Sequence, residues 1–154
     1  MTLLAILLAL AHALAGAAWF GSMFYSLTVL QPRAARFFAT PGQFEAFITA
    51  VSAGARWKVL GAFTFMGVTG LGLLVLRWPA SQSSSWLAVV AAKVVLFLAA
   101  LVVFWYVSWR LWPARVLALP EEVPGLQRRF RRVGWAMIVL VGLNIVLGVV
   151  AHHV

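Results

Sequence analysis

The sequence predicts an all-α integral membrane protein, a four-helix bundle with both chain ends outside the cell. Three observations predict it: the composition is strongly apolar, four apolar stretches are long enough to cross a bilayer, and basic residues gather between them. Of 154 residues, 64% are hydrophobic and 10% are charged, which is more apolar surface than the core of a soluble domain this size needs. Without cysteine, the chain has no disulfide framework and no thiolate metal site.

Four stretches have the length that a membrane-spanning helix needs, about 20 apolar residues. Helices are expected because lipid tolerates only backbones whose hydrogen bonds are satisfied internally. A cleaved signal peptide is disfavoured, since no basic residue precedes the first apolar run and the run continues past the small residues that resemble a cleavage site. No internal repeat stands out, so we predict one domain, residues 1–154. The predicted spans are 3–30, 59–76, 86–108 and 133–151.

Basic residues set the predicted orientation. Ten lie between the first and second spans or between the third and fourth, whereas Arg77 alone lies between the second and third. The positive-inside rule therefore places both basic segments in the cytoplasm of a bacterial-type plasma membrane. The net charge of +9 is therefore better explained by contact of these segments with anionic lipids than by binding to nucleic acid. The ten residues are Arg33, Arg36, Arg56, Lys58, Arg110, Arg115, Arg128, Arg129, Arg131 and Arg132.

The first cytoplasmic segment contains a predicted short helix. In TPGQFEAFITAVSAG (residues 40–54), Phe44, Phe47, Ile48 and Val51 recur at helical spacing behind a Thr-Pro-Gly break. An apolar face of this kind suits a helix that lies in the inner membrane interface.

One histidine, His12, lies inside the first span, where ionisable groups are rare and usually functional. Counting helical rise from the outer surface puts His12 at a depth of about 13 Å, Lys93 at about 10 Å and Asn144 at about 12 Å. Thr69 of the second span falls near mid-depth. We therefore expect polar side chains from all four spans to meet in the outer half of the bundle.

These polar residues also have structural alternatives. His12 could hydrogen-bond to Thr69 or Asn144 as a packing contact between helices. Lys93 could extend its ammonium group to the lipid headgroups, and Asn144 could simply join two helices. Gly16, one turn after His12, could let helices approach closely or leave room for a flat ligand.

The remaining candidate metal ligands are weaker. His152 and His153 at the end of the sequence form a pair that binds metal only weakly. Met23, Met66 and Met137 are better explained by packing than by copper binding.

Two stretches resemble known membrane proteins. HALAGAAWFGSMFYSLTVLQP (residues 12–32) resembles the first span of copper resistance protein D (CopD) relatives and of HemJ-type protoporphyrinogen oxidases, which share an early histidine, a W-x-G-like step and a final proline. WLAVVAAKVVLFLAALVVFWYVSWRLW (residues 86–112) is similar to their Trp-then-Lys span, with Lys93 in the place of the lysine. The resemblance implies a bundle in which His12 and Lys93 matter for haem or metal handling.

Three functions follow as hypotheses. The first is binding of haem, or another redox cofactor, with His12 as axial ligand and a haem-linked oxidoreductase as the possible activity. Copper transport or tolerance, with His12 as the metal ligand, is the second. The third is a non-catalytic accessory subunit of a membrane complex, or a homo-oligomer, in which His12 is structural. For haem, the residues expected around the ring are Trp19, Phe97 and Phe104, with Lys93, Asn144 and Gly16 beside it.

Overall fold

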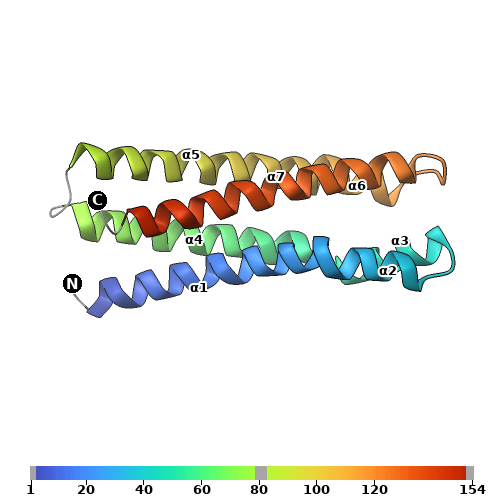
Figure 1. Cartoon of the computed structure of the whole chain (residues 1–154), viewed down its shortest axis with the longest axis horizontal. Coiled ribbons are helices and arrows are strands. Elements are labelled where there is room, and N and C mark those ends of the chain that lie inside the picture. Colours follow the sequence, from blue (N-terminus) through green and yellow to red (C-terminus); the bar gives the residue numbers. More distant parts are fainter. Residues whose placement is uncertain (1–2, 79–82, 152–154) are drawn as a thin grey trace.

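The computed structural model describes residues 3–78 and 83–151, and within these ranges it contains helices and no strand. Four long helical rods lie side by side (Figure 1). Two of them contain a short π-helical segment, η1 or η3. The elements are α1 (Leu3–Tyr25), η1 (Ser26–Leu30), α2 (Gln31–Phe37), α3 (Pro41–Val51), α4 (Ala55–Arg77), α5 (Ser84–Tyr106), η3 (Val107–Leu111), α6 (Trp112–Val116) and α7 (Val123–Val150). His152 and His153 lie outside the described residues.

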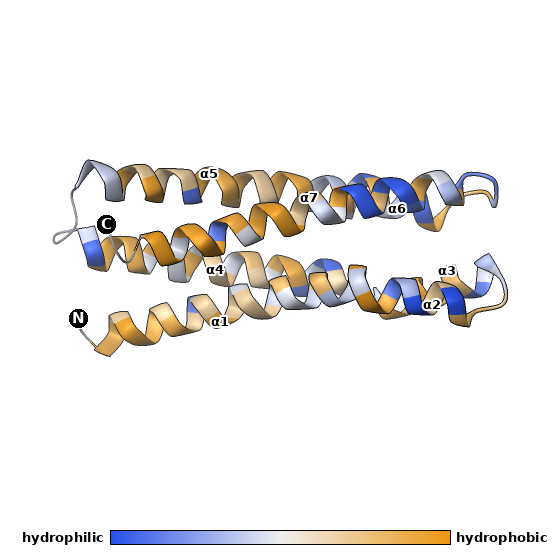
Figure 2. Ribbon diagram, in the orientation of Figure 1, coloured by the Kyte–Doolittle hydropathy of each residue, from blue (hydrophilic) through white to orange (hydrophobic). Residues whose placement is uncertain are grey.

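The predicted four spans are confirmed as four helices that are long and apolar enough to cross a membrane. α1 packs against α4 and α7, and α5 packs against α7. The start of α1 and the end of α7 lie at one end of the bundle, and α2, α3 and α6 lie at the other (Figure 1). Hydrophilic residues gather at that second end, which we call the basic end, while most of the remaining helical length is hydrophobic (Figure 2).

The helices are longer than the apolar stretches that predict them. The first rod runs without a break from Leu3 to Phe37 and the third from Ser84 to Val116. Hydropathy marks only the apolar part of a helix, whereas backbone hydrogen bonding continues into polar residues. At 35 residues the first rod is about 52 Å long, against about 30 Å for a hydrocarbon core. Its last turns therefore extend beyond the core.

The short helix predicted after the first span is present as α3. The Thr40 hydroxyl accepts a hydrogen bond from the Gln43 N–H at 3.3 Å, and Pro41 occupies the first turn. Phe44 and Ile48 are buried against Ala34 of α2, whereas Val51 of the same predicted face is exposed. The location of α3 in the membrane interface stays a prediction.

Phe63 of α4 lies at the centre of the core. It is 2% exposed, and its ring centroid lies 4.6 Å from that of Trp19, 5.5 Å from Phe97 and 5.2 Å from Phe104. These edge-on and tilted contacts are the arrangements that aromatic quadrupoles favour. They tie α4 to α1 and to α5.

The structure reveals an internal repeat that the residue pattern does not show. α5 ends 81 residues after α1 (106 minus 25), and η3 begins and ends 81 residues after η1 (107 minus 26, 111 minus 30). The same offset relates Pro32 to Pro113, each the second residue of the helix that follows the π segment. It also relates His12 to Lys93.

The return helices repeat as well. Phe63, Met66 and Thr69 of α4 are buried, and residues 75 positions later on α7 are Ile138, Val141 and Asn144, of which the first two are buried and the third half-buried. Each half is thus a helical hairpin, α1 with α4 and α5 with α7. His12 and Lys93 occupy the same position in the two hairpins.

The π segment of the second half supplies a bond between the halves. The Trp112 N–H donates to the Val107 carbonyl, five residues back, and Pro113 has no N–H. The Ser108 carbonyl therefore receives no hydrogen bond from Trp112 or Pro113, the residues four and five positions later that would otherwise donate to it. The guanidinium of Arg56 at the start of α4 donates to this carbonyl. Its Cζ lies over the Trp109 ring, 4.8 Å from the ring centroid.

Candidate functional site

His12 is joined to the second span by one short hydrogen bond. Its Nδ1 lies 2.8 Å from the Thr69 hydroxyl, which itself donates to the Phe65 carbonyl at 2.8 Å. The hydroxyl has a single proton, so the tautomer that keeps its bond to the Phe65 carbonyl has the hydrogen on Nδ1, which donates to Thr69. Nε2 then keeps its lone pair, which is the form of imidazole that binds a metal ion. The interhelical bond weighed for His12 is therefore present.

Gly70 makes room for this imidazole. A Cβ at Gly70 would lie 3.2 Å from Cε1 of His12, closer than ordinary packing allows. At Gly16, one turn after His12, a Cβ would meet nothing within 4 Å. Of the two roles considered for Gly16, the structure thus favours open space over close helix approach.

Lys93 pairs with Asn144 and does not reach for the headgroups. The ammonium donates to the Asn144 backbone carbonyl at 2.8 Å and to Oδ1 at 3.0 Å, and the Asn144 amide donates to the Lys93 carbonyl at 2.9 Å. A Cβ at Gly148 would lie 3.1 Å from the Lys93 Nζ, so glycine again leaves space for the polar group. These bonds hold α5 against α7.

The polar residues form two pairs instead of the single meeting point expected from their depths. No hydrogen bond joins His12–Thr69 to Lys93–Asn144 in the described part of the chain. The pairs occupy corresponding places in the two hairpins, α1 with α4 and α5 with α7.

The aromatic residues expected around haem are used for packing. Trp19 is 9% exposed and meets Phe63 edge-on, and Phe97 and Phe104 contact the same Phe63 ring. They pack around Phe63 in the core of the bundle. A role for these residues around haem stays a prediction.

Three methionines that are scattered in the sequence contribute to the same core cluster in the structure. Met66 and Met137 are buried in the core cluster with Trp19, and Met23 packs against this cluster. Met66 lies one turn from Thr69, whose hydroxyl is 3.3 Å from the Met66 carbonyl. The core cluster thus contains methionines from α1, α4 and α7. His12 lies on α1 and bonds to Thr69 of α4, two of the same helices. The described residues contain no group of three or more His, Asp or Glu side chains placed to hold a metal.

Sequence reasoning missed a polar cluster at the basic end. Arg115 of α6 is 7% exposed and donates to both carboxylate oxygens of Glu45 of α3, at 2.8 and 2.9 Å, and the Gln127 amide of α7 donates to Oε1 at 2.8 Å. Burial raises the pKa of Glu45, but these hydrogen bonds and the charge of Arg115 outweigh burial and leave that pKa below its ordinary value. The sequence contains one signal for this cluster: Glu45 is the only acidic residue before residue 121, in a segment rich in arginine, which favours an ion pair.

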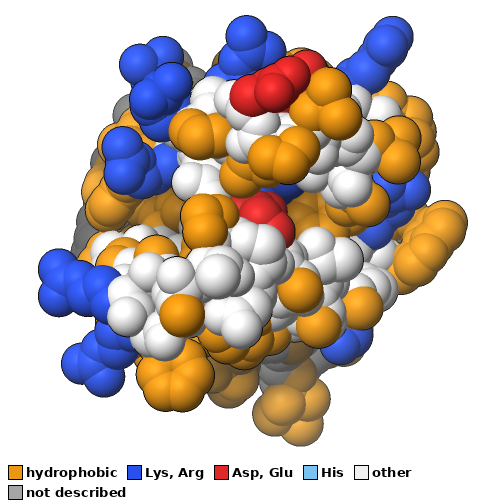
Figure 3. Space-filling model, turned by 90° about the vertical axis from the view of Figure 1, so that its right-hand side faces the viewer, with side chains coloured by type: hydrophobic (Ala, Val, Ile, Leu, Met, Phe, Trp, Pro, Cys, Tyr) orange, Lys and Arg blue, Asp and Glu red, His pale blue; other side chains and the backbone are white. Residues whose placement is uncertain are grey.

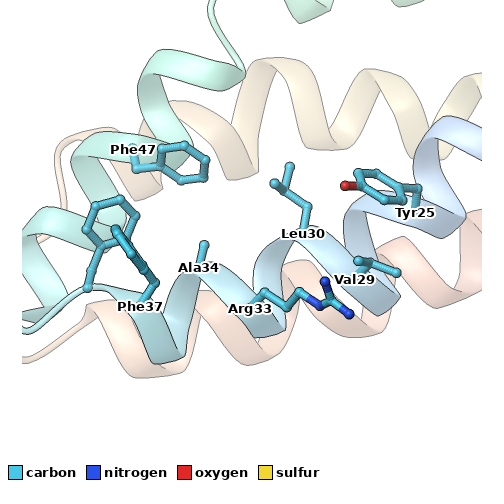
Figure 4. A pocket seen from close by; sticks show the side chains of 8 residues that line it. Tyr25, Val29, Leu30, Arg33, Ala34, Phe37 and Phe47 are labelled. Atoms are coloured by element: carbon cyan, nitrogen blue, oxygen red, sulfur yellow. The ribbon is translucent and has the colours of Figure 1, made fainter.

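Two clefts open at the basic end, and neither includes His12, Lys93 or Asn144. One, of about 360 Å³, lies between the first rod and Phe47 of α3 and is apolar except for Tyr25 and Arg33 (Figure 4). The other, of about 630 Å³, separates α2 and α3 from α6 and α7 and is lined by three arginines. Seen from this end, arginine and lysine side chains surround the bundle (Figure 3).

Comparison with known proteins gives a family match. The family profile described as copper resistance protein D matches residues 55–151, which are 97 of the 154 residues. The matched region contains Thr69, Lys93 and Asn144 and begins after His12. No curated protein and no solved structure matches the chain.

Proposed function

The chain belongs to the copper resistance protein D family and is a multi-pass membrane protein, and from this premise we propose that it binds copper(I) as cargo within its helical bundle. His12 is the proposed entry ligand through Nε2. Met66, one turn from the Thr69 that bonds to His12, is the first proposed sulfur ligand. Copper(I) prefers soft sulfur donors together with imidazole. Met23 and Met137 extend the proposed path toward the basic end.

The gathering of three methionines in one core is the observation that carries this proposal. A membrane core packs equally well with leucine, so thioethers on three inward helix faces are not required by packing alone. The Thr69 bond supports it by fixing the His12 tautomer. The positive charge of Lys93 would repel a nearby copper ion, but the Lys93 ammonium is held on α7 by hydrogen bonds to two oxygens of Asn144.

Competition for copper(I) between the purified full chain and a chromophoric chelator tests this proposal. We expect the wild type to retain one equivalent, and His12→Ala and Met66→Leu each to weaken affinity at least about tenfold, which corresponds to 1.4 kcal/mol. Leucine has nearly the volume of methionine but no sulfur. Ile138→Leu, a buried aliphatic change on α7, is the matched control and should bind like the wild type.

Two outcomes would overturn the copper assignment. One is a wild type that retains no copper(I) in the presence of the chelator. The other is a set of variants in which Met66→Leu binds as tightly as Ile138→Leu. A Soret absorption band in the same purified wild type would instead favour the haem hypothesis.

A further inference from the structure

The larger cleft at the basic end has a lining of mixed character. Its polar side includes Arg115, Arg128 and Arg131, and its apolar side includes Leu27, Phe38 and Phe44. Residues from the first half of the repeat face residues from the second half across it. A ligand that fills this space would therefore have both an anionic and an apolar part.

The charges in this cleft are not balanced. Arg115 is paired with Glu45, whose carboxylate accepts three hydrogen bonds. Arg128 and Arg131, one turn apart on α7, are exposed, and among residues 3–78 and 83–151 neither has an ion-pair or hydrogen-bond partner. Glu122, at the nearby α6–α7 connection, accepts from the Leu119 N–H and does not line the cleft. Two guanidinium groups thus remain for an anion.

The depth of the cleft indicates where that anion comes from. Leu27 follows Leu3 by 24 residues, or about 36 Å of helix. The hydrocarbon core ends after about 30 Å, so a bundle whose first rod enters the core near Leu3 holds this cleft at the level of the lipid headgroups. Phosphodiesters with acyl chains attached are the most concentrated anions at that level.

We propose that the cleft between α2–α3 and α6–α7 binds the phosphate of an anionic phospholipid through Arg128 and Arg131. Guanidinium groups match phosphate geometry and make charge-assisted hydrogen bonds with it. The hydrogen-bonded Glu45–Arg115–Gln127 cluster holds the wall behind them. Leu27, Phe38 and Phe44 cover the start of the acyl chains. The bound lipid bridges the two hairpins. This site is separate from the copper proposal and shares no residue with it.

Native mass spectrometry of the full chain in detergent, titrated with phosphatidylglycerol, tests the site. We expect one tightly held lipid in the wild type and at least a tenfold loss of affinity in R128Q/R131Q. The matched control is R129Q/R132Q, which removes the same charge from the same turns of α7 at residues that do not line the cleft. It should keep the lipid within about twofold.

The alternatives give different results. Equal losses in the two double variants would show general surface attraction and overturn the site. Phosphatidylcholine held as tightly as phosphatidylglycerol would overturn recognition of net anionic charge. Soluble glycerol phosphate bound as tightly as the lipid would overturn the lipid as the source of the phosphate.

Discussion

Thr69 decides which nitrogen of His12 is free. Its hydroxyl lies 2.8 Å from the Phe65 carbonyl and 2.8 Å from the imidazole, and both bonds are kept together only when the proton is on Nδ1. A histidine without such a partner would exchange tautomers, so its coordinating nitrogen would be undefined.

Replacing Thr69 tests this role. Thr69→Val keeps the shape of the side chain but leaves the Nδ1–H without an acceptor, so we expect a stability loss of about 1 kcal/mol and weaker copper(I) binding. Thr69→Ser keeps the hydroxyl and should restore binding to near the wild-type level. Thermal unfolding in detergent and chelator competition measure the two effects. Equal binding by the valine and serine variants would contradict the assigned tautomer.

Gly70 gives a second prediction at the residue scale. In Gly70→Ala the new Cβ lies 3.2 Å from His12 Cε1, so the ring must shift by a few tenths of an ångström. Gly16→Ala is the control, since its Cβ meets nothing within 4 Å. We expect the imidazole NMR signals of His12 to move in the first variant and to stay in place in the second. Unchanged signals in both would mean that Gly70 does not position the ring.

At the scale of elements, the Glu45–Arg115 pair ties α3 to the end of the third rod. Both partners are largely shielded, with 5% of the Arg115 side chain and 19% of the Glu45 side chain exposed. Removing one partner of such a pair leaves a charge without compensation, which costs about 3 kcal/mol. α3 is thus held by an ion pair as well as by its apolar face.

The pH dependence of unfolding checks this pair. The pKa of Glu45 in the folded chain is below its ordinary value of 4.5, so the pair contributes fully above that value and its contribution is lost as the pH falls through the folded-state pKa. We therefore expect the free energy of unfolding of the wild type to fall as the pH drops below about 5, where carboxyl groups begin to be protonated. Glu45→Gln should be less stable at pH 7 and show a smaller loss on acidification. An identical pH slope would contradict the ion-pair role.

The whole molecule is asymmetric in charge along the bundle axis. Hydrophilic and basic residues gather at the end that holds α2, α3 and α6 (Figures 2 and 3), and the positive-inside rule places this end in the cytoplasm. The orientation stays a prediction, because the fold is the same in either direction.

Cysteine labelling can determine the orientation, since the chain has no native cysteine. Ser85→Cys lies near the start of α5 and Leu119→Cys in the α6–α7 connection, and both positions are exposed. A membrane-impermeant maleimide should label Ser85→Cys in intact cells and Leu119→Cys only after lysis. The reverse pattern would place the basic end outside.

The sequence by itself determined the four spans and the short helix α3. Both signals are local. The hydropathy of an apolar run alone indicates that it is stable in lipid, and the Thr-Pro start and helical spacing of α3 lie within a few residues of one another. The polar positions His12, Thr69, Lys93 and Asn144 were also visible, because each interrupts an apolar run.

Tertiary structure alone decided which side chains meet. Pairing His12 with Thr69, gathering Met23, Met66 and Met137, and joining Glu45 to Arg115 across 70 residues all depend on which helix faces are turned toward each other. The repeat was hidden for the same reason, since membrane packing conserves the placement of helices and bends while many apolar residues fill a position equally well. Composition fixes how deep a residue lies in the bilayer, and only packing fixes its neighbour.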